Sequence, residues 1–302
     1  MRRNLISILS FCLISSFALA QLKGNHRSGH ASFGRSKPPY RYELIGGLGA
    51  TNFLGDLGGA NQIGTHAFKD LNLALTRPAV TIGFRFKIAP NFSVKNNLCW
   101  GILSGNDALT QEYFRHNRNL NFRSQVWELS TQLEYNFVKE QKGHVYKIKG
   151  VRGMQHKDRQ YYLFVGGGVF HFHPYGEWNG KWYDLPPLHT ENVSYSLYSA
   201  MISTGGGLRF AINRYWGVGF EVGLRYTFTD YLDDVSGNYP SVAWYQTASA
   251  TAQHFSNPSL LYSGAELAGQ QRGDPTHKDA YMFGCFTVGY KVMYKKRSRS
   301  KF

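Results

Sequence analysis

The sequence predicts an all-β fold, an eight-stranded antiparallel transmembrane β-barrel of the outer-membrane type. The first observation is residues 126–137, where apolar and polar side chains alternate without a fault. Successive side chains of a strand point to opposite faces, so this segment has one apolar and one polar face. The second is the composition, with 21 Phe, 20 Tyr and 33 Gly among 302 residues, which is typical of antiparallel β-structure. The third is that no stretch of the mature chain resembles a spanning helix of roughly 20 apolar residues.

Residues 1–20 have the features of a cleavable signal peptide. A basic pair at residues 2–3 precedes an apolar run over residues 5–19 that ends in small residues. The run is too short for a spanning helix, so an N-terminal membrane anchor is the weaker alternative. We expect cleavage near Ala20, export to the cell envelope, and integration of the mature chain into the outer membrane. Residues 21–39 then form a flexible basic periplasmic arm.

Eight segments repeat the alternating pattern. In chain order they are 40–51, 79–88, 92–102, 126–137, 161–173, 201–212, 216–228 and 280–294. A single segment of this kind also suits the edge of a soluble sandwich, but eight of them with aromatic residues on one face predict a lipid-facing wall around a polar lumen. Glycines in the first segment suggest bends in a curved strand, and the fifth has the least regular alternation.

Two hairpins resemble each other in sequence. Residues 83–94, GFRFKIAPNFSV, and residues 207–218, GLRFAINRYWGV, align without a gap, and each has a tight turn in the middle. They predict equivalent hairpins at the same end of the barrel, with chance resemblance between aromatic strands as the alternative.

The connections alternate in length along the chain. Long external loops are expected at 52–75, 104–123, 174–200 and 230–278, and the opposite end has tight turns and a basic periplasmic linker at 139–159. Outer-membrane barrels have short periplasmic turns and long external loops, with both chain ends in the periplasm. The barrel is expected to span residues 40–294, followed by a basic periplasmic tail at 295–302. The linker is longer than such turns usually are.

The polar faces of the segments carry charges of both signs. The interior of an eight-stranded barrel is just wide enough for side chains to fill it, so these charges predict a lumenal ion-pair network and not a conduction path. The predicted network consists of Glu43, Arg85, Glu128, Glu134, Arg209, Glu221 and Arg225. Cys99 and Cys285 share this inward face, as two separate thiols or, less favoured, as a disulfide across the lumen.

Positive charge is concentrated at the predicted periplasmic end. The arm, the linker and the tail together carry as much net charge as the whole chain, +15. Concentrated like charge steers association, so we expect a docking surface for an acidic periplasmic partner. Solvated termini and anionic lipid headgroups are the alternatives, whereas export makes nucleic acid an improbable partner. The candidate partner-binding residues are Lys139, Lys142, Lys147, Lys149, Arg152, Lys157, Arg159, Lys295, Lys296, Arg297 and Arg299.

No arrangement of residues predicts catalysis, a cofactor or a metal site. His171 and His173 share a strand face without a third metal ligand at a suitable spacing, which favours a structural role. Residues 272–274 spell Arg-Gly-Asp, an adhesion tripeptide so short that chance is the better explanation. We therefore expect a protein that is not an enzyme.

Several strings resemble the PorG family. They are NFLGDLG at 52–58, WEL at 127–129, TDYLDDVSGNY at 229–239, and Arg-Gly-Asp at 272–274 before KDAY at 278–281. The resemblance covers most of residues 40–294. It implies an outer-membrane barrel that is a structural component of the Bacteroidetes type IX protein secretion system. It also implies contact with, and anchoring of, a periplasmic lipoprotein ring of PorK and PorN type.

The family-like strings contain a group of acidic residues, Asp56, Asp230, Asp233 and Asp234. Aspartate side chains accept hydrogen bonds from nearby backbone amides, so a role in holding turns is favoured over weak Ca²⁺ binding. A lipid- or small-molecule-binding barrel and a surface adhesin are the alternative functions.

Overall fold

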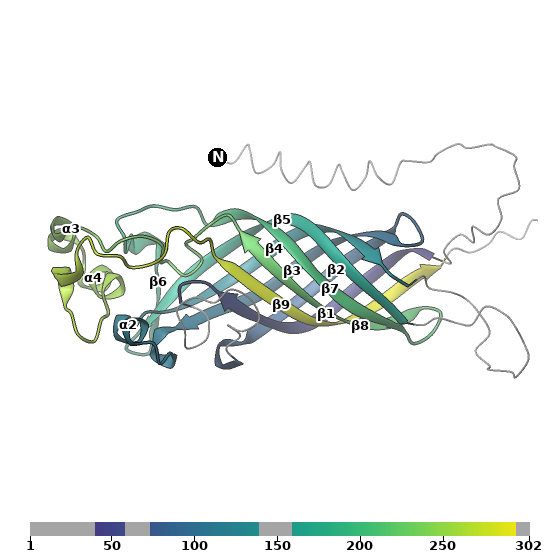
Figure 1. The fold of residues 1–302 in the computed structure, drawn as a ribbon, viewed down its shortest axis with the longest axis horizontal. Helices are drawn as coiled ribbons and strands as arrows, with labels where there is room; N and C mark the ends of the chain where they lie inside the picture. The colour runs from purple at the N-terminus through teal and green to yellow at the C-terminus, as the bar shows by residue number, and fades with distance from the viewer. Residues whose placement is uncertain (1–39, 58–72, 139–158, 294–302) are drawn as a thin grey trace, which may run out of the picture. The chain divides into compact units, whose positions relative to one another are not determined.

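The structure is a computed structural model that describes residues 40–57, 73–138 and 159–293. These residues belong to one unit, Pro39–Phe302. They form a closed barrel of tilted strands with small helices gathered at one end (Figure 1). The barrel strands are β1 (Tyr40–Leu54), β2 (Arg77–Lys87), β3 (Phe92–Asn106), β4 (Asn121–Asn136), β5 (Arg159–Trp178), β7 (Tyr198–Ala211), β8 (Trp216–Thr227) and β9 (Ala280–Met293).

Every barrel strand pairs antiparallel with its neighbours along the chain. Pairing of β1 with β9 closes the barrel and leaves no free edge among these strands. A ninth strand, β6 (Lys181–Asp184), lies outside the wall and forms a hairpin with the end of β5. The predicted eight-stranded antiparallel barrel is confirmed.

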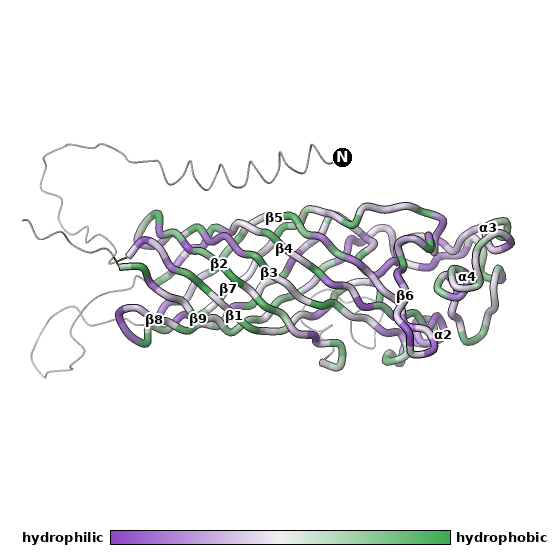
Figure 2. The backbone as a smooth tube through the Cα atoms, turned by 180° about the vertical axis from the view of Figure 1, so that it is seen from behind, coloured by the Kyte–Doolittle hydropathy of each residue, from purple (hydrophilic) through white to green (hydrophobic). Residues whose placement is uncertain are grey.

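The wall has an apolar outside and a polar inside. In β4, Trp127 and Leu133 are 50% and 44% exposed on the outer face, while Glu128 and Glu134 are fully buried in the lumen. Figure 2 shows hydrophobic and hydrophilic residues alternating along the barrel strands. An apolar exterior that surrounds a charged interior is the arrangement of a membrane-spanning barrel, because lipid covers the outer side chains. No helix within the described ranges is long and apolar enough to cross a membrane.

The strands extend further at the long-loop end than the sequence predicts. β3 continues to Asn106, β4 begins at Asn121 and β5 continues to Trp178, so the loops expected at 104–123 and 174–200 are shorter than predicted. At this end many of the inward side chains are themselves apolar and form a buried core that includes Leu103, Phe122, Phe170 and Phe172. Where the inner face is apolar, apolar and polar residues no longer alternate along the strand, and this alternation was the basis on which the strand ends were predicted. The irregular fifth segment has the same cause.

Short helices and hydrogen-bonded loops cover the long-loop end of the barrel (Figure 1). The α-helices are α2 (Tyr113–Arg118), α3 (Val242–Thr247) and α4 (Ala250–Ser256). Turns of 3₁₀-helix lie at Leu73–Leu75, Asp107–Leu109, Pro186–Leu188 and Gly264–Leu267. We call the described loop residues at this end, 55–57, 107–120, 179–197 and 228–279, the cap.

The two similar hairpins have the same turn. In β2–β3 the amides of Ile88 and Ala89 both donate to the Phe92 carbonyl, and in β7–β8 the amides of Ile212 and Asn213 both donate to the Trp216 carbonyl. These are the positions that the ungapped alignment equates. The equivalence of the hairpins is therefore real in three dimensions, and both tight turns lie at the end where β1 begins and β9 ends.

Candidate functional site

Glu134 is the centre of a network of ion pairs in the lumen. Its carboxylate accepts two hydrogen bonds from Arg85, from Nε at 2.7 Å and from Nη2 at 2.9 Å, and a third from Arg209 Nη2 at 3.1 Å. The remaining Arg85 nitrogen, Nη1, donates to Glu43 at 2.6 Å. Such two-pronged arginine–carboxylate pairs fix geometry as well as charge. Glu43, Arg85, Glu134 and Arg209 thus tie together β1, β2, β4 and β7.

Two further groups continue the network toward the cap. Lys95 is bonded to Glu221, which also accepts from the Tyr162 hydroxyl at 2.6 Å. Arg225 Nε lies 3.2 Å from Glu128, and Ser130 donates to the same carboxylate at 2.8 Å. The seven residues that the sequence assigned to the lumen, Glu43, Arg85, Glu128, Glu134, Arg209, Glu221 and Arg225, are all buried there.

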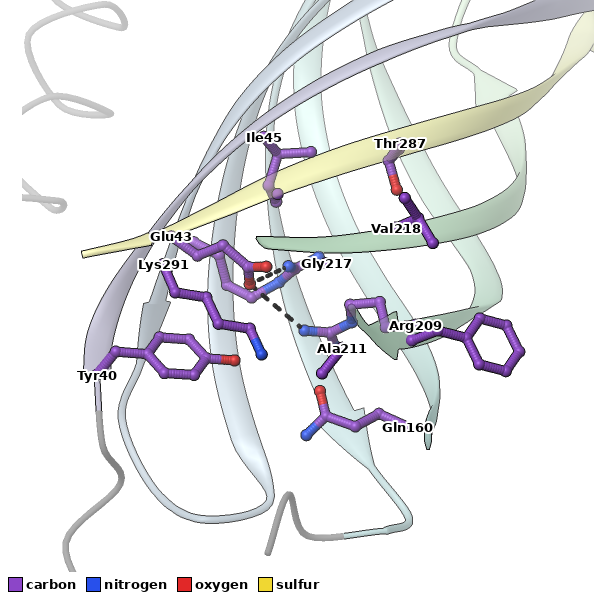
Figure 3. A pocket seen from close by; sticks show the side chains of 13 residues that line it. Tyr40, Glu43, Ile45, Gln160, Arg209, Ala211, Gly217, Val218, Thr287 and Lys291 are labelled. Atoms are coloured by element: carbon purple, nitrogen blue, oxygen red, sulfur yellow. Dashed lines mark hydrogen bonds and ion pairs between the residues drawn. The ribbon is translucent and has the colours of Figure 1, made fainter. Parts of the chain in front are cut away.

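The network leaves little open space in the lumen. Two cavities between its side chains measure about 20 and 10 Å³. A cavity needs on the order of 10–15 Å³ to hold one water molecule. The first cavity lies at the short-turn end, where Tyr40, Gln160, Arg209 and Lys291 surround it (Figure 3). The charged side chains of the lumen are buried, and neither of these two cavities is wide enough to be a passage. Their ion pairs link strands of the barrel to one another.

Two arginines organise the cap, the half-buried Arg118 and the buried Arg272. Arg118 Nε and Nη2 bind the Asp107 carboxylate at 2.7 and 3.2 Å, and its terminal nitrogens donate to the carbonyls of Arg272 and Asp56. Arg272 pairs with Glu191 at 2.9 Å and donates to three backbone carbonyls from two segments of the last loop. Together they connect all four long loops.

The Arg-Gly-Asp string is part of this framework. Arg272 is 3% exposed, and Gly273 is buried against Asp56 and Val235. The Arg272 guanidinium is bonded to Glu191 and to three backbone carbonyls, so it does not face solvent and is not accessible to a receptor. The tripeptide is a structural element of the cap, and its presence in the sequence is therefore no argument for an adhesin.

The family-like aspartates meet in the cap and hold backbone amides. Asp233 accepts from the amides of Val235 and Leu57, each at 3.1 Å, and Asp56 accepts from the Asp274 amide at 2.8 Å. Asp230 accepts from the Ser236 hydroxyl at 2.6 Å. These bonds join the first and fourth long loops. Within the described ranges no group of three or more His, Cys, Asp or Glu has the geometry of a metal site.

Burial sets the protonation of these acids. It raises the pKa of Asp233 well above the ordinary value, and the nearby Asp56 carboxylate raises it further. Burial likewise raises the pKa values of Asp56 and Asp230. Asp234, with φ of 65°, accepts from Thr190 and Tyr195, and burial raises its pKa to about 6 in spite of Arg272. Ionising these acids therefore opposes the folded cap.

The sequence did not single out Arg118, Glu191 or Asp279, which are as central to the cap as the family-like aspartates. Asp279 accepts from the Leu232 amide at 3.0 Å, and burial together with Asp233 and Asp230 raises its pKa well above the ordinary value. Its place directly before the last strand, inside the string KDAY, was the available signal. Arg118, the last residue of α2, and Glu191 fall in connections whose sequence shows no repeating pattern, so nothing marked them.

Most of the predicted partner-binding residues lie outside the described residues. These are Lys139, Lys142, Lys147, Lys149, Arg152, Lys157, Lys295, Lys296, Arg297 and Arg299. Arg159 is described and is exposed at the start of β5, with its guanidinium 6.0 Å from the ring centre of Phe210. The expected signal peptide, arm and tail also fall outside the described ranges.

The histidine pair and the cysteines have ordinary environments. His171 and His173 are half-buried on the outer face of β5, where His173 Nε2 lies 2.5 Å from Asp184 and His171 packs against Tyr198. Cys99 and Cys285 are both free and buried. The favoured expectation of two separate thiols agrees with this.

Comparison with solved structures finds small outer-membrane barrels. Ail of Yersinia pestis, in complex with the heparin analogue sucrose octasulfate, is 8% identical with a TM-score of 0.39, covering 84% of this chain and 100% of that chain. Outer membrane protein W of E. coli is 15% identical with a TM-score of 0.36, over 85% and 100%. OprG of Pseudomonas aeruginosa is 9% identical with a TM-score of 0.36, over 84% and 98%. Likenesses at this level say nothing about what the chain binds.

No curated protein sequence matches the chain. Its closed barrel, apolar exterior and charged lumen are those of an outer-membrane β-barrel protein. A family match spans most of this barrel and extends into the cap. The chain belongs to the DUF6089 family, described as a domain of unknown function, which its residues 42–275 match.

Proposed function

We propose that this outer-membrane barrel is a structural component of the type IX protein secretion machinery of Bacteroidetes. In this proposal it catalyses no reaction, and its short-turn end contacts or anchors a periplasmic lipoprotein ring of PorK and PorN type. The chain reaches the outer membrane after signal-peptide cleavage near Ala20. The resemblance of its loop strings to the PorG family supports the identity of the machinery.

The observation that carries the proposal is where the basic segments join the barrel. Tyr40, where β1 begins, pairs with Met293, where β9 ends. The end of β4 and the start of β5 lie at the same end of the barrel. The segments 21–39, 139–158 and 294–302 therefore all attach at the short-turn end, which faces the periplasm in outer-membrane barrels. Charge gathered at one end favours an acidic partner there.

The filled lumen supports a role by contact over a role in passage. Arg85, Glu134 and Arg209 are bonded to one another inside the lumen near the short-turn end, and the cap covers the other end (Figure 1). A barrel of this kind offers a rigid anchor in the membrane. Its surfaces for partners are then its two ends.

Affinity capture tests the proposal. A tag inserted between Asn179 and Gly180, an exposed turn of the β5–β6 hairpin, leaves the short-turn end untouched. Capture from membranes is expected to recover the ring proteins, and Lys147→Glu with Lys149→Glu is expected to reduce recovery at least several-fold. The control is Arg123→Glu with Lys181→Glu, which changes charge equally on exposed residues at the cap end. Recovery and secretion that persist unchanged in the first variant would refute the docking role.

A further inference from the structure

The mouth of the lumen at the short-turn end has more positive than negative charge. Lys87, Arg209 and Lys291 are buried there, at 7%, 8% and 5% exposed. The carboxylates that face them are Glu43 and Glu134, and Arg85 and Arg209 share both in ion pairs. Four cations, Arg85, Lys87, Arg209 and Lys291, thus lie close to two carboxylates, and this net positive charge favours an incoming anion.

Arg209 has hydrogen-bonding capacity that the described residues leave unused. Its Nη2 donates to Glu134 at 3.1 Å and to Asn136 at 2.7 Å. Its Nε and Nη1 have no hydrogen-bond acceptor in the described part of the chain, although Nη1 forms a longer ion pair with Glu43 at 3.8 Å. The Tyr162 ring lies 4.2 Å from the guanidinium carbon and holds the group in place. Unmet donors on a buried cation are unfavourable, because the group has lost its hydrogen bonds to water without replacing them.

These donors face a cavity that opens at the mouth. It measures about 20 Å³ and is lined by Tyr40, Glu43, Gln160, Arg209 and Lys291. Figure 3 shows the polar ends of Tyr40, Gln160 and Lys291 gathered around this space, with Arg209 directed across it toward Glu43. Gln160 is the direct cross-strand partner of Arg209 in the β5–β7 pairing. A space of this size holds water or the oxygen atoms of a single carboxylate.

We propose that this cavity, the mouth pocket, binds one carboxylate of an acidic peptide, with Arg209 as its main ligand. The site lies inside the ring of strands, whereas lipid chains cover the outer faces of the same strands, so a lipid headgroup would have to leave the membrane to reach it. Glu43 at the edge of the pocket disfavours a phosphate with two charges. The choice of a protein partner rests on the proposed function; the anion site itself does not.

The test uses the full chain folded in detergent. The probe is a fluorescent peptide of alternating Gly and Glu with blocked ends, and binding is measured by fluorescence anisotropy. Arg209→Gln is expected to weaken binding at least tenfold. Arg214→Gln removes the same charge from the exposed β7–β8 turn at the same end and is expected to change binding less than twofold. Equal binding by wild type and Arg209→Gln, or equal binding of a Gly-Gln peptide, would overturn the proposal.

A second variant covers the case in which Arg209→Gln does not fold. Gln160→Glu places a carboxylate opposite Arg209, where it takes the unmet donors itself. We expect this variant to be as stable to urea as wild type and to lose peptide binding at least tenfold. Full binding by Gln160→Glu would refute the site. Displacement of the peptide by inorganic phosphate or anionic vesicles at lower concentration than by free glutamate would refute the choice of a peptide carboxylate.

Failure of this proposal and of the proposed function can be told apart. Peptide binding in detergent needs no secretion machinery, so peptide binding without ring capture counts against the type IX role alone. Ring capture that is unaffected by Arg209→Gln counts against the pocket alone.

Discussion

Single side chains in this protein have effects that depend on the charges around them. Glu134 is fully buried, receives hydrogen bonds from two arginines and lies 3.8 Å from Lys95. A buried pair is weak evidence for stability as a whole, but loss of one partner leaves uncompensated charge. Loss of the Glu134 carboxylate would leave three cations, Arg85, Arg209 and Lys95, without a shared partner.

Glu134→Gln is expected to destabilise the barrel by about 3–5 kcal/mol, because three cations lose their shared carboxylate. Urea unfolding in lipid vesicles, followed by tryptophan fluorescence, measures the change. Glu177→Gln alters an exposed glutamate of β5 and should stay within about 0.5 kcal/mol of wild type. Equal stability of the two variants would show that the network contributes nothing.

Protonation of the cap aspartates makes the cap sensitive to pH. Burial raises the pKa of Asp234 to about 6 from an ordinary value of 3.8. A carboxyl with a raised pKa stabilises the folded state fully below its ordinary pKa, and this contribution is lost as pH rises through the raised pKa. The raised pKa values of Asp56, Asp230, Asp233 and Asp279 act in the same direction.

We therefore expect the cap to be more stable at pH 5 than at pH 7. Hydrogen exchange at the amides of Ser236 and Gly237, which bond to Glu191, reports cap opening once intrinsic rates are corrected. In Asp234→Asn the protection of these amides should change less between pH 4 and pH 6 than it does in wild type. Protection that is equal at pH 5 and pH 7 would contradict the raised pKa values.

At the scale of elements, the molecule consists of a barrel and a cap, and two arginines connect the loops of the cap. The barrel strands satisfy their backbone groups in the sheet, whereas the cap loops depend on side chains such as Arg118 and Arg272. The two parts should open independently, because local stability follows local contacts.

Arg272→Lys is expected to open the cap and leave the barrel intact. A lysine carries the charge but cannot reach Glu191 and three carbonyls in the fixed geometry of a guanidinium. Limited proteolysis should cleave residues 228–279 at least tenfold faster than in wild type, while strand amides keep their protection. Arg123→Lys, an exposed arginine at the same end, is the control. Cleavage at the wild-type rate would mean that the charge alone holds the cap.

At the scale of the whole molecule, closure of the sheet and filling of the lumen decide what the barrel can do. An eight-stranded barrel has room for its own side chains, and here they form ion pairs across it. The protein is therefore expected to add no stable conductance steps to a planar lipid bilayer, in contrast to a sixteen-stranded porin. The same preparation should show heat-modifiable migration on a gel, which proves that it is folded. Conductance from such folded protein would contradict the filled lumen.

The sequence by itself determined the number of barrel strands, their antiparallel order, the inward charges and the end at which β1 begins and β9 ends. It did so because a wall between lipid and a charged lumen imposes a period of two on every strand, as residues 126–137 show. Only the tertiary structure decided the cap, the burial of Arg272 and the unmet donors of Arg209. These depend on loops far apart in the chain meeting without a repeating pattern, and on which acid each arginine reaches, Glu191 for Arg272 and Glu134 for Arg209. The alternation of side chains along a strand shows that a charged residue points into the barrel, but its ion-pair partner depends on how the strands pack in three dimensions.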